Sequence, residues 1–433
     1  MREMKDSGIP WIGKIPKTWE IVPFGIFLDN IPNSIVDGPF GSDMKNDEYV
    51  DEGVPIIQLG AIRDHGMNFT NMHYITEEKA DSLIRHNAYP NDIVIAKMMP
   101  AGKACEIPDK FSRYVVSADV IKATISNKYL RKFLVYAFNV YCITQAQYES
   151  QGSTRARVNI HKVKRFKIAK PVYLESKLIV DYLDTKCARI DSIRKNVEAE
   201  IEALKQYKQS VITEAVTKGL DKNVEMKDSG IPWIGKIPEN WITDKFKYHL
   251  KRKEPRNPGN QVVLSLYRDY GIIPKDSRDD NHNVTSEDTS KYKYVQIGNF
   301  VVNKMKAWQG SVAVSNYEGI VSPAYYVYKF SDPQINKKYF HYLMRACYKD
   351  EFMRLSGGLR VGQWDLPADG LENTYILIPP IQEQQRIANY LDAKCARIDS
   401  IIQKKQGLLA NLDAYKKSLI YEYVTGKKEV PAV

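Results

Sequence analysis

This chain of 433 residues contains two copies of one segment, and the first copy reads Tyr182-Leu183-Asp184-Thr185-Lys186-Cys187-Ala188-Arg189-Ile190-Asp191-Ser192-Ile193. The second copy occupies residues 390–401 and differs only at Ala393, which replaces Thr185. Further on, the run at residues 207–212 has a close counterpart at residues 415–420. One structural element is therefore used twice, about half a chain apart.

Both copies lie in stretches whose apolar residues recur at steps of three and four, the period of an amphipathic helix. We predict helices at about residues 175–218 and 382–425, each followed by a glycine that can end it. The predicted apolar stripes are Ile190, Ile193, Val197, Ile201, Leu204, Tyr207, Val211 and Ala215, and Ile387, Leu391, Ile398, Ile401, Leu408, Leu412, Tyr415 and Leu419. Charged residues between the first set, including Lys205 and Lys208, are interpreted as a solvated face.

Two such helices can bury each other's apolar stripes. At 1.5 Å per residue each helix measures about 65 Å, and a single helix of that length would expose its stripe to water. Because the chain leaves through one globular body and returns through another, antiparallel pairing as a coiled coil is expected. The sequence therefore predicts a rod that relates the two bodies by a pseudo-twofold, effectively circular arrangement.

A second repeat precedes each body. The run Met4-Lys5-Asp6-Ser7-Gly8-Ile9-Pro10-Trp11-Ile12-Gly13-Lys14-Ile15-Pro16 recurs without change at residues 226–238. Its Pro and Gly content argues against a helix. One interpretation is a packed linker with Trp11 and Trp233 as core residues, and the other is a contact surface for a partner subunit.

The bodies between the repeats, residues 20–170 and 242–378, show little sequence similarity to each other. Both contain short apolar runs bounded by turn residues, which predict strands, followed by a helix near residues 130–147 and 337–355. We predict an α+β chain with boundaries at 1–170 (first body and box), 171–222 (first long helix), 223–378 (second body and box) and 379–433 (second long helix and tail). An ordinary tandem duplication does not explain why the connections stay nearly identical while the bodies diverge.

Composition narrows the class of protein. The formal net charge is +11, which favours a polyanionic partner, although generic solubility charge is an alternative. The five cysteines show no C-x-x-C spacing, so neither a disulfide framework nor a structural zinc site is expected. The sequence shows no signal peptide and no apolar stretch of membrane-spanning length, and we expect a cytoplasmic protein without membrane contact.

Basic, aromatic and amide side chains cluster beside glycine-rich segments of both bodies. Arg and Lys can pair with guanine, and Gln with adenine, in the major groove. Taken singly each residue is more simply a solvated loop residue, but together the clusters favour DNA. The predicted DNA-binding residues are Arg155, Arg157, Lys162, Lys164 and Arg165 in the first body and Lys304, Lys306, Trp308, Gln309, Arg360 and Gln363 in the second.

These features together resemble the specificity subunits of type I restriction–modification systems. The resemblance is carried by the box at residues 5–13 and its copy, and by the helix entry Ile378-Pro379-Pro380-Ile381-Gln382-Glu383-Gln384-Gln385-Arg386-Ile387-Ala388. Further segments of this kind are residues 38–42, 53–57, 303–310 and 319–325. At the first entry, Lys170-Pro171-Val172-Tyr173-Leu174-Glu175 lacks the double proline and the Glu-Gln-Gln run, which could weaken one partner contact.

The resemblance implies two target-recognition domains that each read half of a split site on double-stranded DNA, with the helices setting the spacer. It implies two methyltransferase subunits docked on the repeated parts, joined by translocase–endonuclease subunits. S-adenosylmethionine, ATP and Mg²⁺ would then belong to the partners, with no cofactor, metal or catalytic residue in this chain. Partner contacts are expected at Trp11, Trp233, Tyr182, Arg189, Tyr390 and Arg397.

Two other classes compete with this interpretation. A two-domain adaptor on a coiled-coil spacer would bind no DNA at any salt concentration. A nuclease using Asp64 with Glu77 and Lys79 would cleave DNA with a metal, but the chain contains 52 acidic and 63 basic residues, so chance explains such a grouping. No phosphate loop, dinucleotide fingerprint or zinc-protease motif is present in the sequence.

Overall fold

A computed structural model describes residues 2–39, 43–63, 66–150, 157–268, 270–278, 285–286, 288–357 and 364–431. The chain divides into two compact units. The first comprises residues 1–197 and 407–433, and the second comprises residues 198–406. Each long helix therefore contributes its start to one unit and its end to the other.

The first unit contains two four-stranded sheets. One has the strand order β11-β10-β13-β4 and is antiparallel, and the other has the order β8-β5-β12-β9, in which β5 and β12 pair in parallel. Side chains of β10 and β13 are buried on both faces, as expected for short apolar runs between turns. The strands are β4 (Ile35–Asp37), β5 (Val54–Ile57), β8 (His73–Ile75), β9 (Asn87–Ala88), β10 (Ile93–Ala96), β11 (Ala104–Glu106), β12 (Tyr114–Val116) and β13 (Val120–Ala123).

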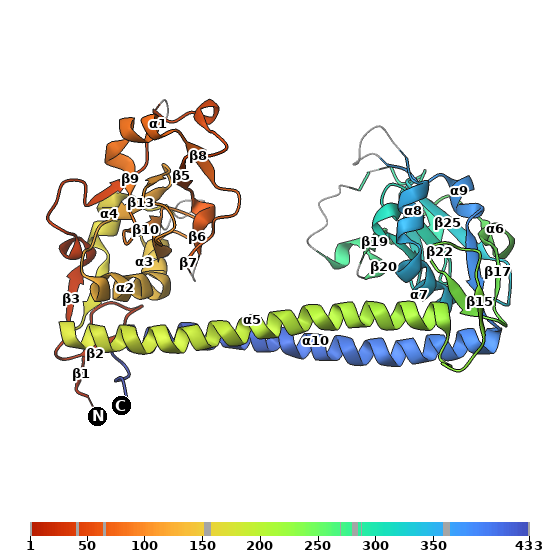
Figure 1. Ribbon diagram of the computed structural model, residues 1–433. Coiled ribbons are helices and arrows are strands. Elements are labelled where there is room, and N and C mark those ends of the chain that lie inside the picture. Colours follow the sequence, from red (N-terminus) through yellow and green to blue (C-terminus); the bar gives the residue numbers. More distant parts are fainter. Residues whose placement is uncertain are drawn as a thin grey trace. The chain divides into compact units, whose positions relative to one another are not determined.

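Helices cover the first sheet. The single helix expected near residues 130–147 consists of α2 (Lys128–Ala137), a π-helical turn at Phe138–Cys142 and α3 (Ile143–Tyr148). The side chain of Asn127 accepts hydrogen bonds from the backbone N–H groups of Tyr129 and Leu130 and so caps α2. The remaining helices are α1 (Glu77–Ser82) and α4 (Ile160–Arg165). Figure 1 shows α2 next to the long helix below it.

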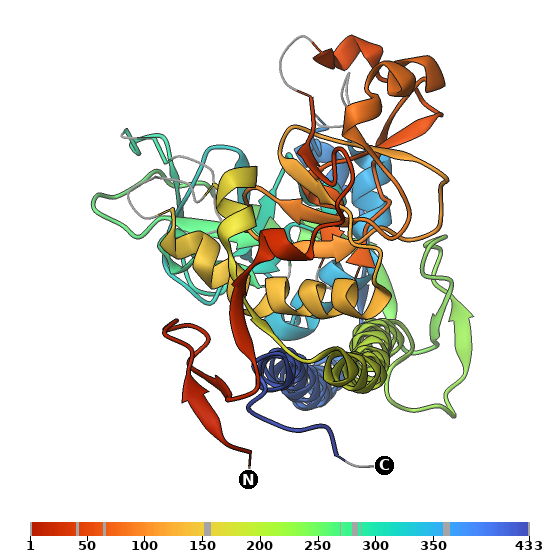
Figure 2. The same ribbon diagram turned by 90° about the vertical axis from the view of Figure 1, so that its left-hand side faces the viewer.

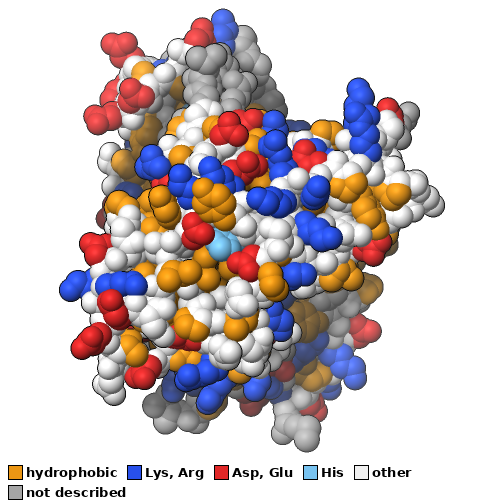
Figure 3. Space-filling model, turned by 90° about the vertical axis from the view of Figure 1, so that its right-hand side faces the viewer, with side chains coloured by type: hydrophobic (Ala, Val, Ile, Leu, Met, Phe, Trp, Pro, Cys, Tyr) orange, Lys and Arg blue, Asp and Glu red, His pale blue; other side chains and the backbone are white. Residues whose placement is uncertain are grey.

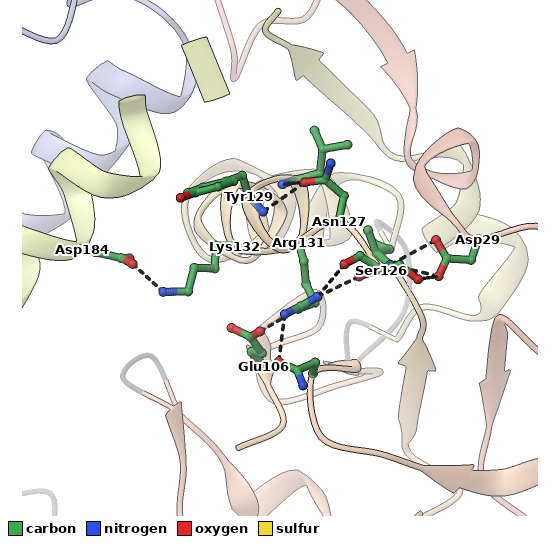
Figure 4. A network of polar contacts seen from close by, with 11 residues as sticks. Asp29, Glu106, Ser126, Asn127, Tyr129, Arg131, Lys132 and Asp184 are labelled. Atoms are coloured by element: carbon green, nitrogen blue, oxygen red, sulfur yellow. Dashed lines mark hydrogen bonds and ion pairs between the residues drawn. The ribbon is translucent and has the colours of Figure 1, made fainter. Parts of the chain in front are cut away.

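Arg131 fastens α2 to the sheet (Figure 4). Its guanidinium donates to Oε1 of Glu106 at 2.6 Å, to the carbonyl oxygen of Ile125 at 3.0 Å and to Oδ1 of Asn91 at 2.9 Å. A buried guanidinium needs such partners because its desolvation is costly. These hydrogen bonds hold α2 against the sheet and against the loops at its edge.

The body of the second unit repeats this topology with different residues. Its sheet has the order β18-β25-β22-β23, and a parallel bridge between Val263 and Ile320 corresponds to the β5–β12 pairing. Residues 337–355 form two helices instead of the single one expected, namely α7 (Lys337–Cys347) and α8 (Lys349–Leu355). The other elements are α6 (Phe246–His249), β18 (Leu250–Arg252), β19 (Leu264–Tyr267), β20 (Gly271–Pro274), β21 (Lys293–Val295), β22 (Phe300–Asn303), β23 (Val312–Val314), β24 (Gly319–Val321), β25 (Tyr325–Phe330) and α9 (Ala368–Glu372).

The repeated boxes are not helical, as their Pro and Gly content indicated, and each forms a β-hairpin. The first hairpin pairs β1 (Met4–Asp6) with β2 (Lys14–Pro16), and the second pairs β15 (Met226–Asp228) with β16 (Lys236–Pro238) in the same register. A further two-stranded ladder follows each box and leads into a long helix. These ladders are β3 (Glu20–Pro23) with β14 (Lys167–Lys170) and β17 (Ile242–Lys245) with β26 (Tyr375–Ile378).

The two long helices are α5 (Tyr173–Lys218) and α10 (Ile381–Val424), and each ends at a glycine with positive φ, Gly219 at +75° and Gly426 at +68°. In the first unit, Lys416 pairs with Asp191 at 2.7 Å and Arg194 with Asp413 at 2.9 Å. The residue number rises on one helix as it falls on the other, so the helices pair in antiparallel orientation. In the first unit, which faces the viewer in Figure 2, the two helices lie side by side.

The second unit shows the same antiparallel pairing. Lys208 lies 2.7 Å from Asp399, and Lys405 pairs with Glu200. The prediction that Lys208 belongs to a solvated face is wrong, because this residue occupies a position of the seam between the helices. Five residues of the predicted stripes are instead exposed, and these are Ile193, Tyr207, Ile401, Leu408 and Tyr415. The seam follows a 3.5-residue period, which shifts the buried positions relative to a straight helix.

Each box packs against the end of a long helix within its own unit. The hydroxyl of Tyr421, near the end of α10, donates to the carbonyl oxygen of Ile12 at 2.9 Å. A Cβ atom at Gly426 would lie 2.5 Å from Cγ of Pro16, so only glycine fits there. In the second unit, Gly219 occupies the same place against Trp241 and Pro238. The two units thus contain the same elements in circularly permuted chain order.

Candidate nucleic-acid interface

The hairpin between β10 and β11 has a counterpart between β22 and β23. Each begins with the dipeptide Lys-Met, at Lys97 and Lys304, and each has a glycine with φ near +85° before its return strand, Gly102 and Gly310. Backbone contacts match as well, because the carbonyl oxygens of Lys97 and Lys304 accept from Val158 and Leu366 at 2.9 and 3.0 Å. The tips of these hairpins are therefore equivalent positions of the two bodies.

The lysine that opens each hairpin holds its base in place. Lys97 is buried, and its ammonium donates to Oδ2 of Asp37 at 2.9 Å and to the carbonyl oxygen of Ala118 at 2.7 Å. Lys304 is less buried and donates to Oδ2 of Asp365 at 3.1 Å. A buried ammonium is tolerated only with such partners, so Lys97 is a structural anchor, and Lys304 makes the corresponding ion pair at a more exposed position.

The DNA-binding residues predicted for the first body lie on one side of it, at and just before α4. Lys164 and Arg165 are exposed on α4, and Lys162 donates to the carbonyl oxygen of Glu149 at 2.9 Å. Arg157 is exposed but pairs with Asp119 at 2.8 Å. Arg155 lies outside the described residues. The structure thus brings four predicted cations to one edge of this body.

In the second body, the predicted residues at positions 304–309 belong to the β22–β23 hairpin. Lys306 is exposed, whereas Trp308 rests edge-on against Trp364 with ring centroids 5.4 Å apart and donates its indole N–H to the carbonyl oxygen of Met305 at 3.1 Å. Gln309 is half-buried. Arg360 and Gln363 lie outside the described residues.

Both units contain a cleft between the hairpin tip, the helix that follows the sheet and the paired long helices. In the second unit the cleft measures about 1250 Å³, and its charged lining residues are Lys205, Lys208, Arg268, Arg345 and Lys349 with Asp350, Asp392 and Asp399. In the first unit it measures about 960 Å³ and is lined by Arg63, Lys103, Lys132, Arg194, Lys416 and Lys417 with Glu106, Asp184, Asp191 and Asp413.

Each cleft therefore has two more basic than acidic residues, five against three and six against four. His341 adds no charge at neutral pH, because burial and the nearby Arg345 lower its pKa to about 4. Concave surfaces with an excess of one charge concentrate ligands of the opposite sign. The clefts thus favour an anionic partner that contacts the bodies and the long helices together.

One polar contact recurs at the wall of both clefts. Tyr136 and Lys132 of α2 donate to Asp184 of α5, with the tyrosine hydroxyl at 2.7 Å, and Figure 4 shows the lysine contact. In the second unit, Tyr342 donates to Asp392 at 2.8 Å and Lys338 donates to the same residue at 2.6 Å. The aspartate of the repeated helix segment therefore fixes the body to the helix in both units.

The six residues predicted to contact partner subunits occupy paired positions of the repeats. Arg189, Arg397, Tyr390 and Trp233 are exposed. The other two pack on aromatic rings: the ring centroids of Tyr182 and Tyr423 lie 4.7 Å apart, and those of Trp11 and Tyr148 lie 5.1 Å apart. On the face drawn in Figure 3, hydrophobic, basic and acidic side chains are interspersed, and the charged side chains do not form one patch of a single sign. Four of the six predicted partner-contact residues are thus exposed within their own unit.

The residues of the nuclease alternative form no common site among the described residues. Glu77 pairs with Arg113 and Lys79 pairs with Glu48, while Asp64 lies outside the described residues. Within the described ranges no group of three or more His, Cys, Asp or Glu side chains could hold a metal ion. The five cysteines are free, and no described helix is long and apolar enough to span a membrane.

Sequence reasoning did not find the equivalence of the two hairpins. The signal was available, since Lys97-Met98 and Lys304-Met305 each follow a buried strand and precede a glycine. Two shared residues within bodies that otherwise differ do not stand out until the strand pairing places them together. The role of Asp184 and Asp392 was also missed, because a repeated aspartate in a helix predicts no particular contact.

The chain matches known proteins along nearly its whole length. The family model described as the type I restriction modification DNA specificity domain matches it twice, at residues 42–203 and 247–410. The putative type I restriction enzyme MjaX specificity subunit of Methanocaldococcus jannaschii is 23% identical over 442 residues, covering 97% of this chain and 96% of that protein. The EcoBI specificity subunit of Escherichia coli is 22% identical over 448 residues, covering 98% and 90%.

A solved structure shares the fold. A chain from a study of complex assembly and conformational transition of the type I R-M system superposes with a TM-score of 0.67 at 15% sequence identity, covering 96% of this chain and 99% of that chain. The fold predicted from the sequence, two mixed α/β bodies with two long helices, is therefore confirmed.

Proposed function

Because this chain belongs to the type I restriction modification DNA specificity domain family, we propose that it is the subunit that reads DNA sequence in a type I restriction–modification complex. Each body reads one half of a bipartite site. The observation that carries this proposal is the repetition of one hairpin and one basic cleft on two bodies whose tip residues differ. A shared frame with different side chains is what two unlike half-sites require.

Binding strength and sequence choice have different sources in this proposal. Phosphate contacts from the cleft cations and from α4 supply most of the affinity, because neutralised phosphates release condensed counterions. A few contacts to base edges then select the sequence. The chain itself performs no chemistry, which is left to its partners.

The partners are two methyltransferase subunits docked on the repeated parts, joined by translocase–endonuclease subunits. The support is the near identity of the repeats and the exposure of Arg189 and Arg397 at matching positions. Two copies of one partner need two copies of one surface. S-adenosylmethionine, ATP and Mg²⁺ would be held by these partners, and the complex would act in the cytoplasm.

The long helices set the spacer between the half-sites in this proposal. Residues 173–218 form one uninterrupted helix that contributes to both units. Inserting seven residues after Ile201 and seven after Lys404 preserves the 3.5-residue period and adds about 10 Å. The expected result is a spacer longer by about three base pairs, since B-DNA rises 3.4 Å per pair.

The decisive test is to map methylated adenines in DNA from cells that carry this chain with its methyltransferase. A split motif is expected. Exchanging residues 20–170 for the corresponding body of a relative should change one half of that motif and leave the other intact. If the purified complex shifts no DNA at low salt and leaves no methylated motif, the two-domain adaptor is the better description.

A further inference from the structure

The third residue of each Lys-Met hairpin, counted from the lysine that opens it, differs in chemistry between the two bodies. It is Met99 in the first body and Lys306 in the second, each two residues after the anchoring lysine. Both side chains are exposed, Met99 by 69%. A large apolar side chain exposed to this extent at a hairpin tip has no packing role in the free protein.

The backbone at Met99 is strained. Its φ is +54°, a conformation that non-glycine residues seldom adopt and that is retained mainly at functional sites. The base of the hairpin is nevertheless rigid, because Lys97 is buried against Asp37 and the carbonyl oxygen of Ala118. Neighbouring Pro100 and Lys103 line the basic cleft of this unit. The tip thus presents an exposed apolar side chain beside a surface that suits an anionic ligand.

Resting on the proposed function, we propose that this tip position is a specificity-determining contact in each body. Met99 contacts the C5-methyl group of a thymine in the major groove, and Lys306 donates to O6 and N7 of a guanine. Apolar side chains recognise the thymine methyl, and lysine is a common partner of the guanine edge. One position with two chemistries then gives the two bodies different half-sites.

The test uses the complex of the full chain with its methyltransferase and a duplex that carries the mapped motif. Replacing thymine by uracil in the first half-site removes only the methyl group. Wild-type affinity should fall about three- to fivefold, the value of one buried methyl group, whereas Met99→Gly should bind both duplexes equally. Glycine accepts positive φ, so this variant keeps or raises the melting temperature.

The second body has a parallel test. Replacing the guanines of the second half-site by 7-deazaguanine removes the N7 acceptor. Wild-type affinity should fall at least fivefold, and Lys306→Met should show no such fall. For the Met99 test, the matched control is Ile84→Ala, which alters an exposed apolar residue elsewhere on the first body. This variant should respond to uracil in the same way as the wild type.

The outcomes separate the two proposals. Absence of any methylated motif with the wild-type chain contradicts the proposed function itself. A split motif whose first half contains no A·T pair or whose second half contains no G·C pair overturns the tip assignment alone. The same holds if Met99→Gly and the wild type respond equally to uracil, or Lys306→Met and the wild type to 7-deazaguanine.

Discussion

The indole N–H of Trp19 donates a hydrogen bond to Oε2 of Glu175 over 2.7 Å, and Trp241 makes the same bond to Glu383 over 3.0 Å. The first helix entry lacks the Glu-Gln-Gln run of the second, yet its one glutamate keeps this role. Gln384, the next residue of the second entry, corresponds to Ser176, and both are fully buried. The difference between the entries therefore leaves the joint between box and helix intact.

Removing the indole N–H should destabilise the first unit. Trp19→Phe deletes a hydrogen bond to a carboxylate and leaves a small void, because Trp19 is fully buried. The expected loss in free energy of unfolding is about 2–4 kcal/mol, measured by urea denaturation. Leu174→Ala, at a neighbouring exposed residue, should cost less than about 0.5 kcal/mol. Equal effects of the two changes would show that the bond contributes nothing.

The ion pairs of the coiled coil should differ in energy between units. The Lys416 side chain is 8% exposed and pairs with Asp191, whereas its counterpart Lys208 is 29% exposed and pairs with Asp399. Lys416→Met leaves a partly buried carboxylate without its cation and should cost about 1–3 kcal/mol. Lys208→Met should cost less than about 1 kcal/mol. The comparison is made by urea denaturation, and a larger loss for Lys208→Met would contradict the burial argument.

The stability of the second unit should depend on pH through His341. The backbone N–H of Val314 donates to its Nδ1 at 3.1 Å, and burial with the nearby Arg345 lowers its pKa to about 4, although Asp392 opposes this shift. The unfolded chain, with a histidine pKa near 6.5, binds more protons between pH 4 and 6.5. Stability is therefore complete above pH 6.5 and falls by about 2–3 kcal/mol as the pH approaches 4.

The measurement for His341 is the urea midpoint as a function of pH. His341→Gln retains an acceptor without titrating, so its midpoint should vary less between pH 4 and 6.5 than that of the wild type. His161→Gln, at an exposed histidine of the first body, is the control and should leave the wild-type profile unchanged. Identical profiles for wild type and His341→Gln would refute this assignment.

The basic residues of α4 should act on affinity and leave sequence choice unchanged. In the double variant Lys164→Ala and Arg165→Ala, the slope of log affinity against log salt concentration should become shallower by about 1.8, or about 0.9 for each phosphate that is no longer neutralised. The methylated motif should stay the same. The measurement is fluorescence anisotropy with a labelled cognate duplex over a salt series, and an altered motif would instead place these residues at base edges.

Much of the architecture followed from contiguous residues. The predicted helices at residues 175–218 and 382–425 agree with Tyr173–Lys218 and Ile381–Val424 within two residues at each end. The strands Val54–Ile57, Ile93–Ala96 and Tyr114–Val116 fall on short apolar runs of the first body, because such runs between turns identify strands locally. The predictions failed where the environment of a residue depends on contacts with a distant segment. Lys208 is an example, because its place in the seam depends on Asp399 of the other helix.

The sequence by itself determined that one frame is used twice, because repeats and helical periodicity are properties of neighbouring residues. Only the tertiary structure decided which residues of the unlike bodies correspond. The hairpins that carry Met99 and Lys306 became comparable through strand pairing and through the backbone contacts of Lys97 and Lys304 to Val158 and Leu366, which lie much further along the chain. Such contacts form only when distant segments of the chain pack together, and a local sequence pattern therefore cannot predict them.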